Sequence, residues 1–135
     1  MADKYVYPAI FRFHAGGVDI EFPDLPGCFS HGATQEEALD MAREAMGLHL
    51  YGMEEDGDPI PVTSPVTAVA VEANEAVVLV DVWMPPLRNA IEQRAVKKTL
   101  TLPKWLNDLA EHHQVNFSHL LQDALKQHLG IKDRP

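Results

Sequence analysis

The most informative stretch of this chain is residues 96–129, VKKTLTLPKWLNDLAEHHQVNFSHLLQDALKQHL. Its pattern predicts a short strand, a short helix, a turn and a second helix. Alternation along the strand places a cation and two hydroxyls on one face, namely Lys97, Thr99 and Thr101. Such side chains carry the donors and acceptors that read base edges in a DNA major groove. We therefore predict that two copies of this strand, one from each of two chains, pair into a DNA-reading ribbon.

The two helices after this strand carry an apolar stripe but form a small unit. Pro103 is tolerated in the first turn of a helix, Asn116 is a good N-cap, and Gly130 follows the last turn of the second helix. A unit of roughly 35 residues rarely buries enough surface to fold alone. With no disulfide available, we expect a homodimer that pools the helices of both copies into one core.

The same unit offers candidate contacts to the DNA backbone. The first turn of the second helix has amides that can bind a phosphate, around Asn116, Phe117 and Ser118. Lys98 and Lys104 are expected to add phosphate contacts that set the register of the protein on the duplex. A plain helix cap is the alternative interpretation of residues 116–118.

The charge of the chain is divided unevenly between its two ends. Residues 1–87 hold three basic and fifteen acidic side chains, a formal charge of −12, whereas residues 88–135 have a charge of +3. Each field attracts a different kind of partner, so the division favours two binding functions. An acidic domain with a mildly charged tail is the simpler alternative.

Composition also bears on compartment and chemistry. Cys28 is the only cysteine, which suits a reducing cytosol. The N-terminus lacks the apolar run of a signal peptide, and no apolar stretch is long enough to span a membrane, so we expect a cytoplasmic protein with no membrane partner. No glycine-rich phosphate loop is present, and none of the seven histidines has i, i+4 spacing to another. We therefore predict no cofactor, no metal ligand, no catalytic residue and no enzymatic activity.

The first 84 residues have the pattern of a small α+β domain. Apolar residues alternate over 5–13 and over 18–22, around Ala15-Gly16-Gly17, which predicts a β-hairpin. Thr34 and Glu37 have capping-box spacing at the start of a predicted helix. The apolar run 77–83 is typical of a central strand covered on both faces. We expect a small sheet with one helix over residues 1–84, a linker over 85–95, and the strand-helix-helix unit over 96–135.

Two groups of motifs resemble known families. The segment KKTLTLP (97–103), followed by two helices, is similar to a ribbon-helix-helix domain, the class of strand readers that includes Arc and MetJ. In the first half, a Tyr-rich strand followed by FPDLPGC (22–28) and GATQEEA (32–38) resembles the HicB antitoxins. Together the two resemblances cover nearly the whole chain.

The resemblance implies an antitoxin of a type II toxin–antitoxin pair. Its N-terminal domain would have a truncated ribonuclease-H-like fold, and would bind and neutralise a HicA-like RNA-cleaving toxin. Its ribbon-helix-helix domain would bind operator DNA and repress both genes. Members of the family often assemble as dimers of dimers, so a tetramer is expected beside the homodimer. The acidic first half is consistent with a basic toxin as partner.

Several interpretations stay open. Asp19, Glu21 and Asp24 are candidate toxin contacts, although a solubilising face is the more common reason for such carboxylates. A ligand-sensing ribbon-helix-helix repressor is one alternative function, and an RNA-processing enzyme is another. A short neighbouring gene that encodes a small basic protein would favour the antitoxin over both.

Overall fold

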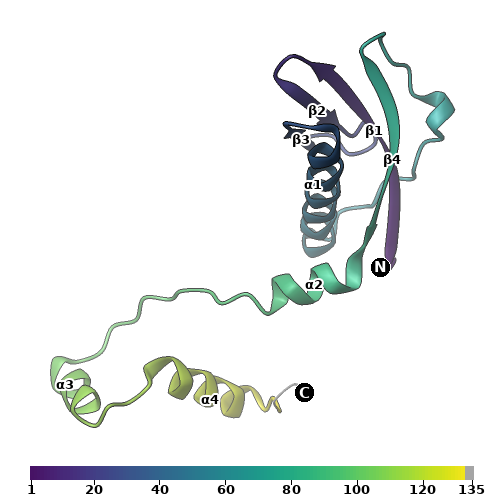
Figure 1. Cartoon of the computed structure of the whole chain (residues 1–135). Coiled ribbons are helices and arrows are strands. Elements are labelled where there is room, and N and C mark those ends of the chain that lie inside the picture. Colours follow the sequence, from purple (N-terminus) through teal and green to yellow (C-terminus); the bar gives the residue numbers. More distant parts are fainter. Residues whose placement is uncertain (133–135) are drawn as a thin grey trace. The chain divides into compact units, whose positions relative to one another are not determined.

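The computed structural model describes residues 1–132 and divides into two compact units between Ala95 and Val96 (Figure 1). The N-terminal unit contains four strands, the helices α1 and α2, and a short 3-10 turn, η1 (Val66–Ala68). The C-terminal unit contains the helices α3 and α4. The fold is therefore α+β, as predicted. Across residues 1–132, no helix is both long and apolar enough to cross a membrane.

A four-stranded antiparallel sheet forms the N-terminal unit, with the strand order β3-β2-β1-β4. The predicted hairpin is confirmed, because β1 (Lys4–His14) pairs with β2 (Gly17–Glu21) across a two-residue loop. β3 (Phe29–Gly32) pairs with the free edge of β2, and β4 (Glu75–Trp83) with the other edge of β1. The small sheet expected for this unit thus has four strands.

The Pro-rich loop between β2 and β3 is part of the hydrophobic core. Leu25 is fully buried, and its carbonyl accepts a hydrogen bond from the amide of Cys28 at 3.0 Å. Gly27, the third residue of this turn, has a φ of +86°, which a type II turn requires and a side chain would disfavour. The motif therefore makes a tight reversal that delivers an apolar side chain into the core.

Helix α1 (Gln35–Asp56) covers one face of the sheet (Figure 1). Its start is as predicted, because the hydroxyl of Thr34 accepts a hydrogen bond from the amide of Glu37 at 3.1 Å. Its buried side chains recur at helical spacing and pack on the inward residues of the strands. The core formed in this way comprises Tyr7, Ala9, Phe11, Val18, Ile20, Phe22, Leu25, Cys28, Ala38, Ala42, Met46, Leu50, Val80 and Met84.

The prediction of a central strand over residues 77–83 is wrong. β4 lies at an edge of the sheet, and among the described residues it pairs with β1 alone. Its inward side chain Val80 is buried, whereas Leu79 and Trp83 on the other face are more than half exposed. Continuous apolarity is typical of strands covered on both faces, but it does not distinguish such strands from an edge strand with an exposed apolar face.

Most of the segment predicted as a linker, residues 85–95, is helical. Residues 84–92 form helix α2 (Met84–Glu92), whose first residue is fully buried and whose Leu87 packs against the core. Arg88 donates two hydrogen bonds to the buried carboxylate of Glu54 at the end of α1, at 2.9 and 2.7 Å. This anchoring makes α2 part of the N-terminal unit, and leaves residues 93–95 as the connection.

The C-terminal unit has the two predicted helices, α3 (Lys104–His112) and α4 (Phe117–Leu129). Pro103 lies at the N-cap of α3, one residue before its predicted place in the first turn. Asn116 caps α4 as predicted, and Gly130 ends it by donating hydrogen bonds to the carbonyls of Gln127 and Lys126. Within residues 96–132, no side chain is buried. The local signals in the sequence therefore specify both helices without a core behind them.

Among residues 1–132 of one chain, the predicted strand before α3 pairs with no other strand. Residues 94–103 belong to no helix or strand. A strand is defined by hydrogen bonds to a neighbouring strand, and the neighbour predicted here belongs to a second copy of the chain. Pairing of this segment stays a prediction.

Candidate functional site

The segment before α3 lies beside a groove that it forms together with the two helices. Leu100 and Leu102 line a groove that also includes residues of α3 and α4. The three predicted base-reading residues, Lys97, Thr99 and Thr101, are exposed. The segment can therefore direct its leucines toward a helical core while its cation and hydroxyls stay available to a ligand.

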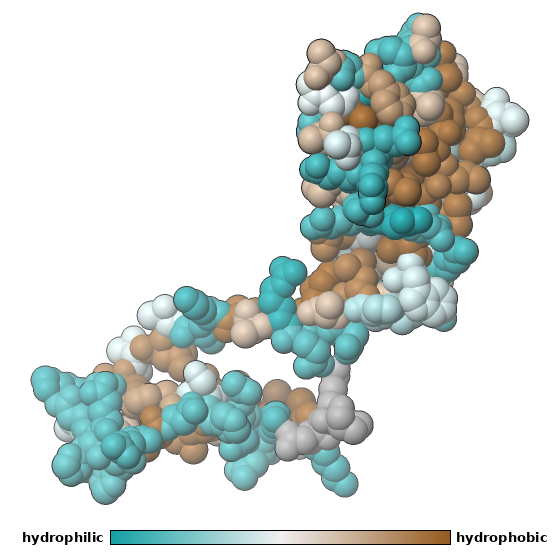
Figure 2. Space-filling view, viewed as in Figure 1, coloured by the Kyte–Doolittle hydropathy of each residue, from teal (hydrophilic) through white to brown (hydrophobic). Residues whose placement is uncertain are grey.

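The groove beside this segment has a volume of about 670 Å³ and a mostly apolar lining. Its helical wall includes Leu106, Ala110, Phe117, Leu120, Leu121 and Ala124. Hydrophobic side chains are exposed along both helices (Figure 2), and Trp105, Leu120 and Leu129 are each about 60 % exposed or more. An apolar surface on this scale in a small unit is typical of a protein interface.

The predicted phosphate-binding residues differ in their contacts. Lys98 and Ser118 lie at the same groove, together with Phe117 in the first turn of α4. The side chain of Asn116 accepts the amide of His119 at 3.0 Å, so it acts as a helix cap. Lys104 forms an ion pair with Asp108 one turn further along α3. The structure thus brings three of the five residues to one place.

The three candidate toxin contacts in the N-terminal unit are already engaged within the chain. Asp24 accepts hydrogen bonds from the amide and hydroxyl of Ser64, at 2.8 and 2.6 Å, and thereby holds the connection between α1 and β4. Glu21 lies 3.8 Å from Arg12 on the neighbouring strand. Asp19 is bonded to two histidines. Val18 and Ile20, which alternate with Asp19 and Glu21 along β2, are buried beneath α1. Asp19 and Glu21 therefore lie on the opposite face of the strand, which points away from α1.

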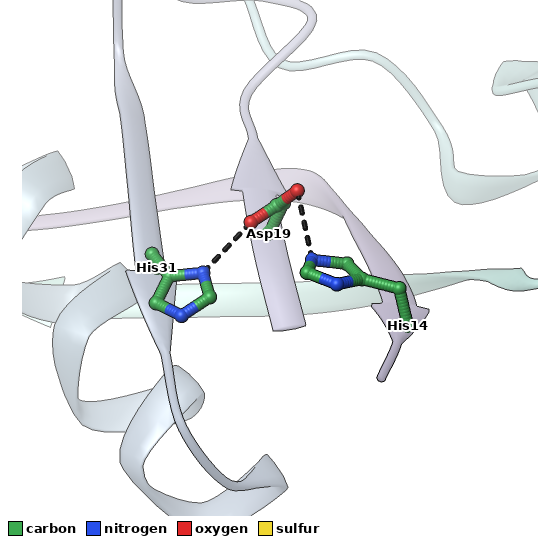
Figure 3. Close-up of side chains that lie close together, drawn as sticks. All are labelled: His14, Asp19 and His31. Carbon is green, nitrogen blue, oxygen red and sulfur yellow. Dashed lines mark hydrogen bonds and ion pairs between the residues drawn. The ribbon is translucent and has the colours of Figure 1, made fainter. Parts of the chain in front are cut away.

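His14, Asp19 and His31 form a compact cluster on this face of the sheet (Figure 3). Nε2 of His14 lies 3.0 Å from one carboxylate oxygen of Asp19, and Nδ1 of His31 lies 2.7 Å from the other. Hydrogen bonds from His31 and then His14 hold the pKa of Asp19 below its ordinary value. The three side chains are 39 %, 46 % and 50 % exposed, so the cluster is open to solvent.

This cluster was not predicted, because the i, i+4 spacing considered for the histidines applies only to ligands on a helix. The hairpin pattern already placed His14 and Asp19 on outward positions of neighbouring strands, and that signal was available. His31 joins them through the pairing of Asp19 with His31 between β2 and β3. The seven-residue loop between those strands leaves that register undefined in the sequence, so only the folded chain brings the second histidine into place.

Cys28 has the properties of a core residue. Its side chain is buried, and burial raises the pKa of its thiol to about 11. The thiolate is the nucleophilic form of cysteine, and a raised pKa keeps this thiol protonated at neutral pH.

Comparison with known proteins assigns the chain to a family. Residues 7–125 match the model of the HicB-like antitoxin of bacterial toxin–antitoxin systems. Because this match covers most of the chain and spans both units, the chain belongs to the HicB-like antitoxin family.

Two curated proteins are similar to parts of the chain. An uncharacterised 14.9 kDa protein in the rep-hol intergenic region of Haemophilus phage HP1 is 39 % identical over 61 residues, which cover 45 % of this chain and 46 % of that protein. Antitoxin HicB 1 of Photorhabdus laumondii is 41 % identical over 51 residues, or 38 % of this chain and 33 % of that one. The matches thus span less than half the length of both relatives.

Solved structures match over a greater length. A chain of a toxin–antitoxin complex from Streptococcus pneumoniae superposes with a TM-score of 0.61 at 25 % identity, over 92 % of this chain and 98 % of that one. The antitoxin HicB of Burkholderia pseudomallei has the same fold, with a TM-score of 0.54 at 20 % identity over 91 % and 98 % of the two chains.

Proposed function

We propose that this chain is an antitoxin that binds and neutralises a HicA-like RNA-cleaving toxin, and that it represses its own operon by binding operator DNA. Family membership supports the antitoxin role. The observation that carries the division into two tasks is the contrast between the units. One is acidic and packs around its own core, whereas the other exposes an apolar groove beside a segment with a polar, partly cationic edge.

The DNA-binding part of the proposal rests on dimerisation. The apolar groove of α3 and α4 would be covered by the same elements of a second copy, and the segments over 96–102 would pair antiparallel. The ribbon would then present Lys97, Thr99 and Thr101 twice about a two-fold axis, which matches the pseudo-symmetry of an operator. Lys98, Phe117 and Ser118 would lie near the phosphates, and Lys104 and Asn116 would complete this set. A dimer of dimers is the further assembly we expect.

The toxin-binding part rests on charge and on the sheet face away from α1. Residues 1–87 have a formal charge of −12, which would speed association with a basic RNA-cleaving protein. Asp19 and Glu21 are outward and about half exposed there, so we propose them as toxin contacts. Asp24 adds charge in the loop between β2 and β3, although its hydrogen bonds to Ser64 also hold that loop to the connection between α1 and β4.

The antitoxin role is tested by RNA cleavage with a HicA-like toxin. We expect stoichiometric full chain to stop cleavage, and residues 1–95 alone to do the same. The double variant Asp19→Asn with Glu21→Gln should associate more slowly with the toxin. Asp40→Asn with Glu44→Gln removes the same charge from exposed positions of α1, and is the matched control. Undiminished cleavage in the presence of the full chain would overturn the proposal.

Repression is tested by mobility shift with DNA from the promoter region of the operon. Binding should weaken steeply with salt, because phosphate contacts release counterions from the duplex. A shift that is equally strong on promoter DNA and on an unrelated duplex would refute specific operator recognition.

A further inference from the structure

We propose that His14, Asp19 and His31 form a binding site for one divalent transition-metal ion of the zinc type. The inference concerns the N-terminal unit alone and does not depend on the toxin or the operator. It rests on the identity of the three side chains, their geometry and the backbone that holds them.

The geometry brings one ligand from each of three adjacent strands to a single point. His14 is the last residue of β1, Asp19 is in the middle of β2, and His31 is in β3 (Figure 3). One ligand atom from each lies within 4.8 Å of the other two. Ligand atoms around a tetrahedral zinc ion are about 3.3 Å apart, given bonds of roughly 2.0–2.1 Å. The present distances between the ligand atoms therefore exceed the distance needed around zinc by at most about 1.5 Å. Rotation of the exposed histidine rings can bring the ligand atoms this much closer together.

The donor set selects the class of metal. Two imidazole nitrogens and one carboxylate oxygen suit zinc, copper, nickel or cobalt, whereas magnesium and calcium prefer oxygen ligands throughout. Three protein ligands leave at least one coordination position vacant. The half-exposed side chains place that position toward solvent, so a water molecule can complete the shell.

The backbone around the cluster makes room for it. Gly17 faces His14 in the hairpin, and a Cβ on Gly17 would come within 3.0 Å of the His31 ring. The absence of that Cβ lets the ring of His31 lie over β2 and toward His14. Gly17 also has a φ of +126°, which residues with a side chain rarely adopt, so both the turn and the cluster depend on this glycine.

The neighbouring charges do not oppose a cation. Arg12 is opposite Asp19 in the register, but its guanidinium donates to Glu75 at 2.8 Å and lies 3.8 Å from Glu21. Its charge is thus balanced by two carboxylates. The unit as a whole is strongly acidic, which raises the local concentration of cations.

Metal binding requires that the ring proton of His14 move from one ring nitrogen to the other. Nδ1 of His14 accepts a hydrogen bond from the amide of Gly16 at 3.1 Å, so the proton of the neutral ring is on Nε2 and points to Asp19. A metal ion on Nε2 would take the place of this proton, which would move to Nδ1 and end the exposed Gly16 contact.

The site is tested by calorimetric titration of the metal-free full chain with zinc chloride at pH 7.5. We expect one saturable site per chain. Asp19→Asn keeps an oxygen and the size of the side chain but removes its charge, and His31→Gln removes one nitrogen ligand. Each should lower the affinity at least tenfold, while circular dichroism shows that the fold is kept. The control is the double variant His112→Gln with His113→Gln, which should bind zinc as the unmodified chain does.

A spectroscopic measurement separates this site from adventitious binding. Imidazole nitrogen resonances of His14 and His31 should shift at one equivalent of zinc, while those of His49 and His119 stay in place. Loss of binding in the His112/His113 double variant, or undiminished affinity in both Asp19→Asn and His31→Gln, would overturn the proposal. So would a chain that binds no zinc, or one whose zinc-induced shifts are spread over all seven histidines.

Discussion

The two units of this protein use their apolar side chains in opposite ways. In residues 1–95, helix α1 and the sheet enclose a continuous core whose members, such as Met46 and Leu50, are fully buried. In residues 96–132 no side chain is buried, although Asn116 and Gly130 cap the two ends of α4, and Leu106, Phe117 and Leu120 are 39–59 % exposed. Burying each such side chain would stabilise the unit by on the order of 1 kcal/mol.

This contrast indicates how each unit becomes stable. The N-terminal unit has its own core, so we expect it to fold as an independent domain. The C-terminal unit can reach comparable burial only against another surface, and a second copy with the same stripe is the partner that symmetry offers. Toxin binding should thus survive at protein concentrations where DNA binding is lost.

The largest effect is expected from a charge placed in the apolar groove of α4. Leu121→Asp should abolish dimerisation and operator binding, because a carboxylate would be buried at the interface without a partner. The melting temperature of the N-terminal unit should not change. Gln122→Asp introduces the same charge at an exposed neighbouring position and serves as the control. Sedimentation and mobility shift give the readout, and a dimeric Leu121→Asp protein would refute the proposed interface.

A large effect on the other unit is expected from a cavity in its core. Leu50→Ala should lower the unfolding free energy of residues 1–95 by about 2–5 kcal/mol, since it removes fully buried methyl groups. Leu48 on the same helix is 44 % exposed, so Leu48→Ala should cost much less. Urea unfolding followed by circular dichroism measures both. Equal losses at the two positions would contradict the assigned core.

A pH-dependent effect is expected at the contact that joins α2 to α1. The hydrogen bonds from Arg88 and Tyr5 hold the pKa of Glu54 below its ordinary value. A lowered pKa in the folded state stabilises the fold at pH values above the pKa of the unfolded chain. That stabilisation is lost as the pH falls through the folded-state pKa.

Glu54→Gln should therefore cost about 2 kcal/mol at pH 7 in residues 1–95, because it breaks a buried charged pair. The difference from the unmodified protein should shrink in acid. Glu55→Gln, at the next and exposed position, is the matched control. Urea unfolding at several pH values measures the difference, and a constant gap from pH 7 to pH 3 would show that Glu54 is not the titrating group.

The most localised effect is expected at single base-reading side chains. Lys97→Ala and Thr99→Ala should each weaken operator binding by about 1–3 kcal/mol without changing toxin neutralisation. Lys132→Ala removes an equal charge at the end of the described chain and should have little effect. Mobility shift and RNA cleavage are measured on the same preparations. If both functions fell together in a folded variant, the division of tasks between the units would be wrong.

Local signals in the sequence predicted local structure well. Thr34, Asn116 and Gly130 mark helix ends where the structure has them, because capping depends on residues within one turn. The hairpin of β1 and β2 was predictable for the same reason, since alternation and a two-residue turn define its register. The α+β class followed from these elements.

The predictions that failed concerned longer-range relations. Residues 77–83 were expected in the centre of the sheet, but strand order depends on which edges are free once the hairpin has formed. Residues 85–95 were expected as a linker, yet Leu87 and Arg88 find partners on the core and on Glu54, more than thirty residues earlier. Such partners cannot be recognised from neighbouring residues alone.

The candidate sites also differ in whether they depend on local signals or on contacts between distant residues. Two of the candidate features are periodic patterns, which can be recognised in the sequence alone: the alternation of Lys97, Thr99 and Thr101, and the apolar stripe of α4. The clustering of His14 and Asp19 with His31 could not be predicted from the sequence. It depends on the pairing of β3 with β2, and the loop between these strands does not define their register. Helix ends, turns and amphipathic faces arise from interactions over a few residues, whereas strand order and side-chain clusters arise only when distant segments pack together.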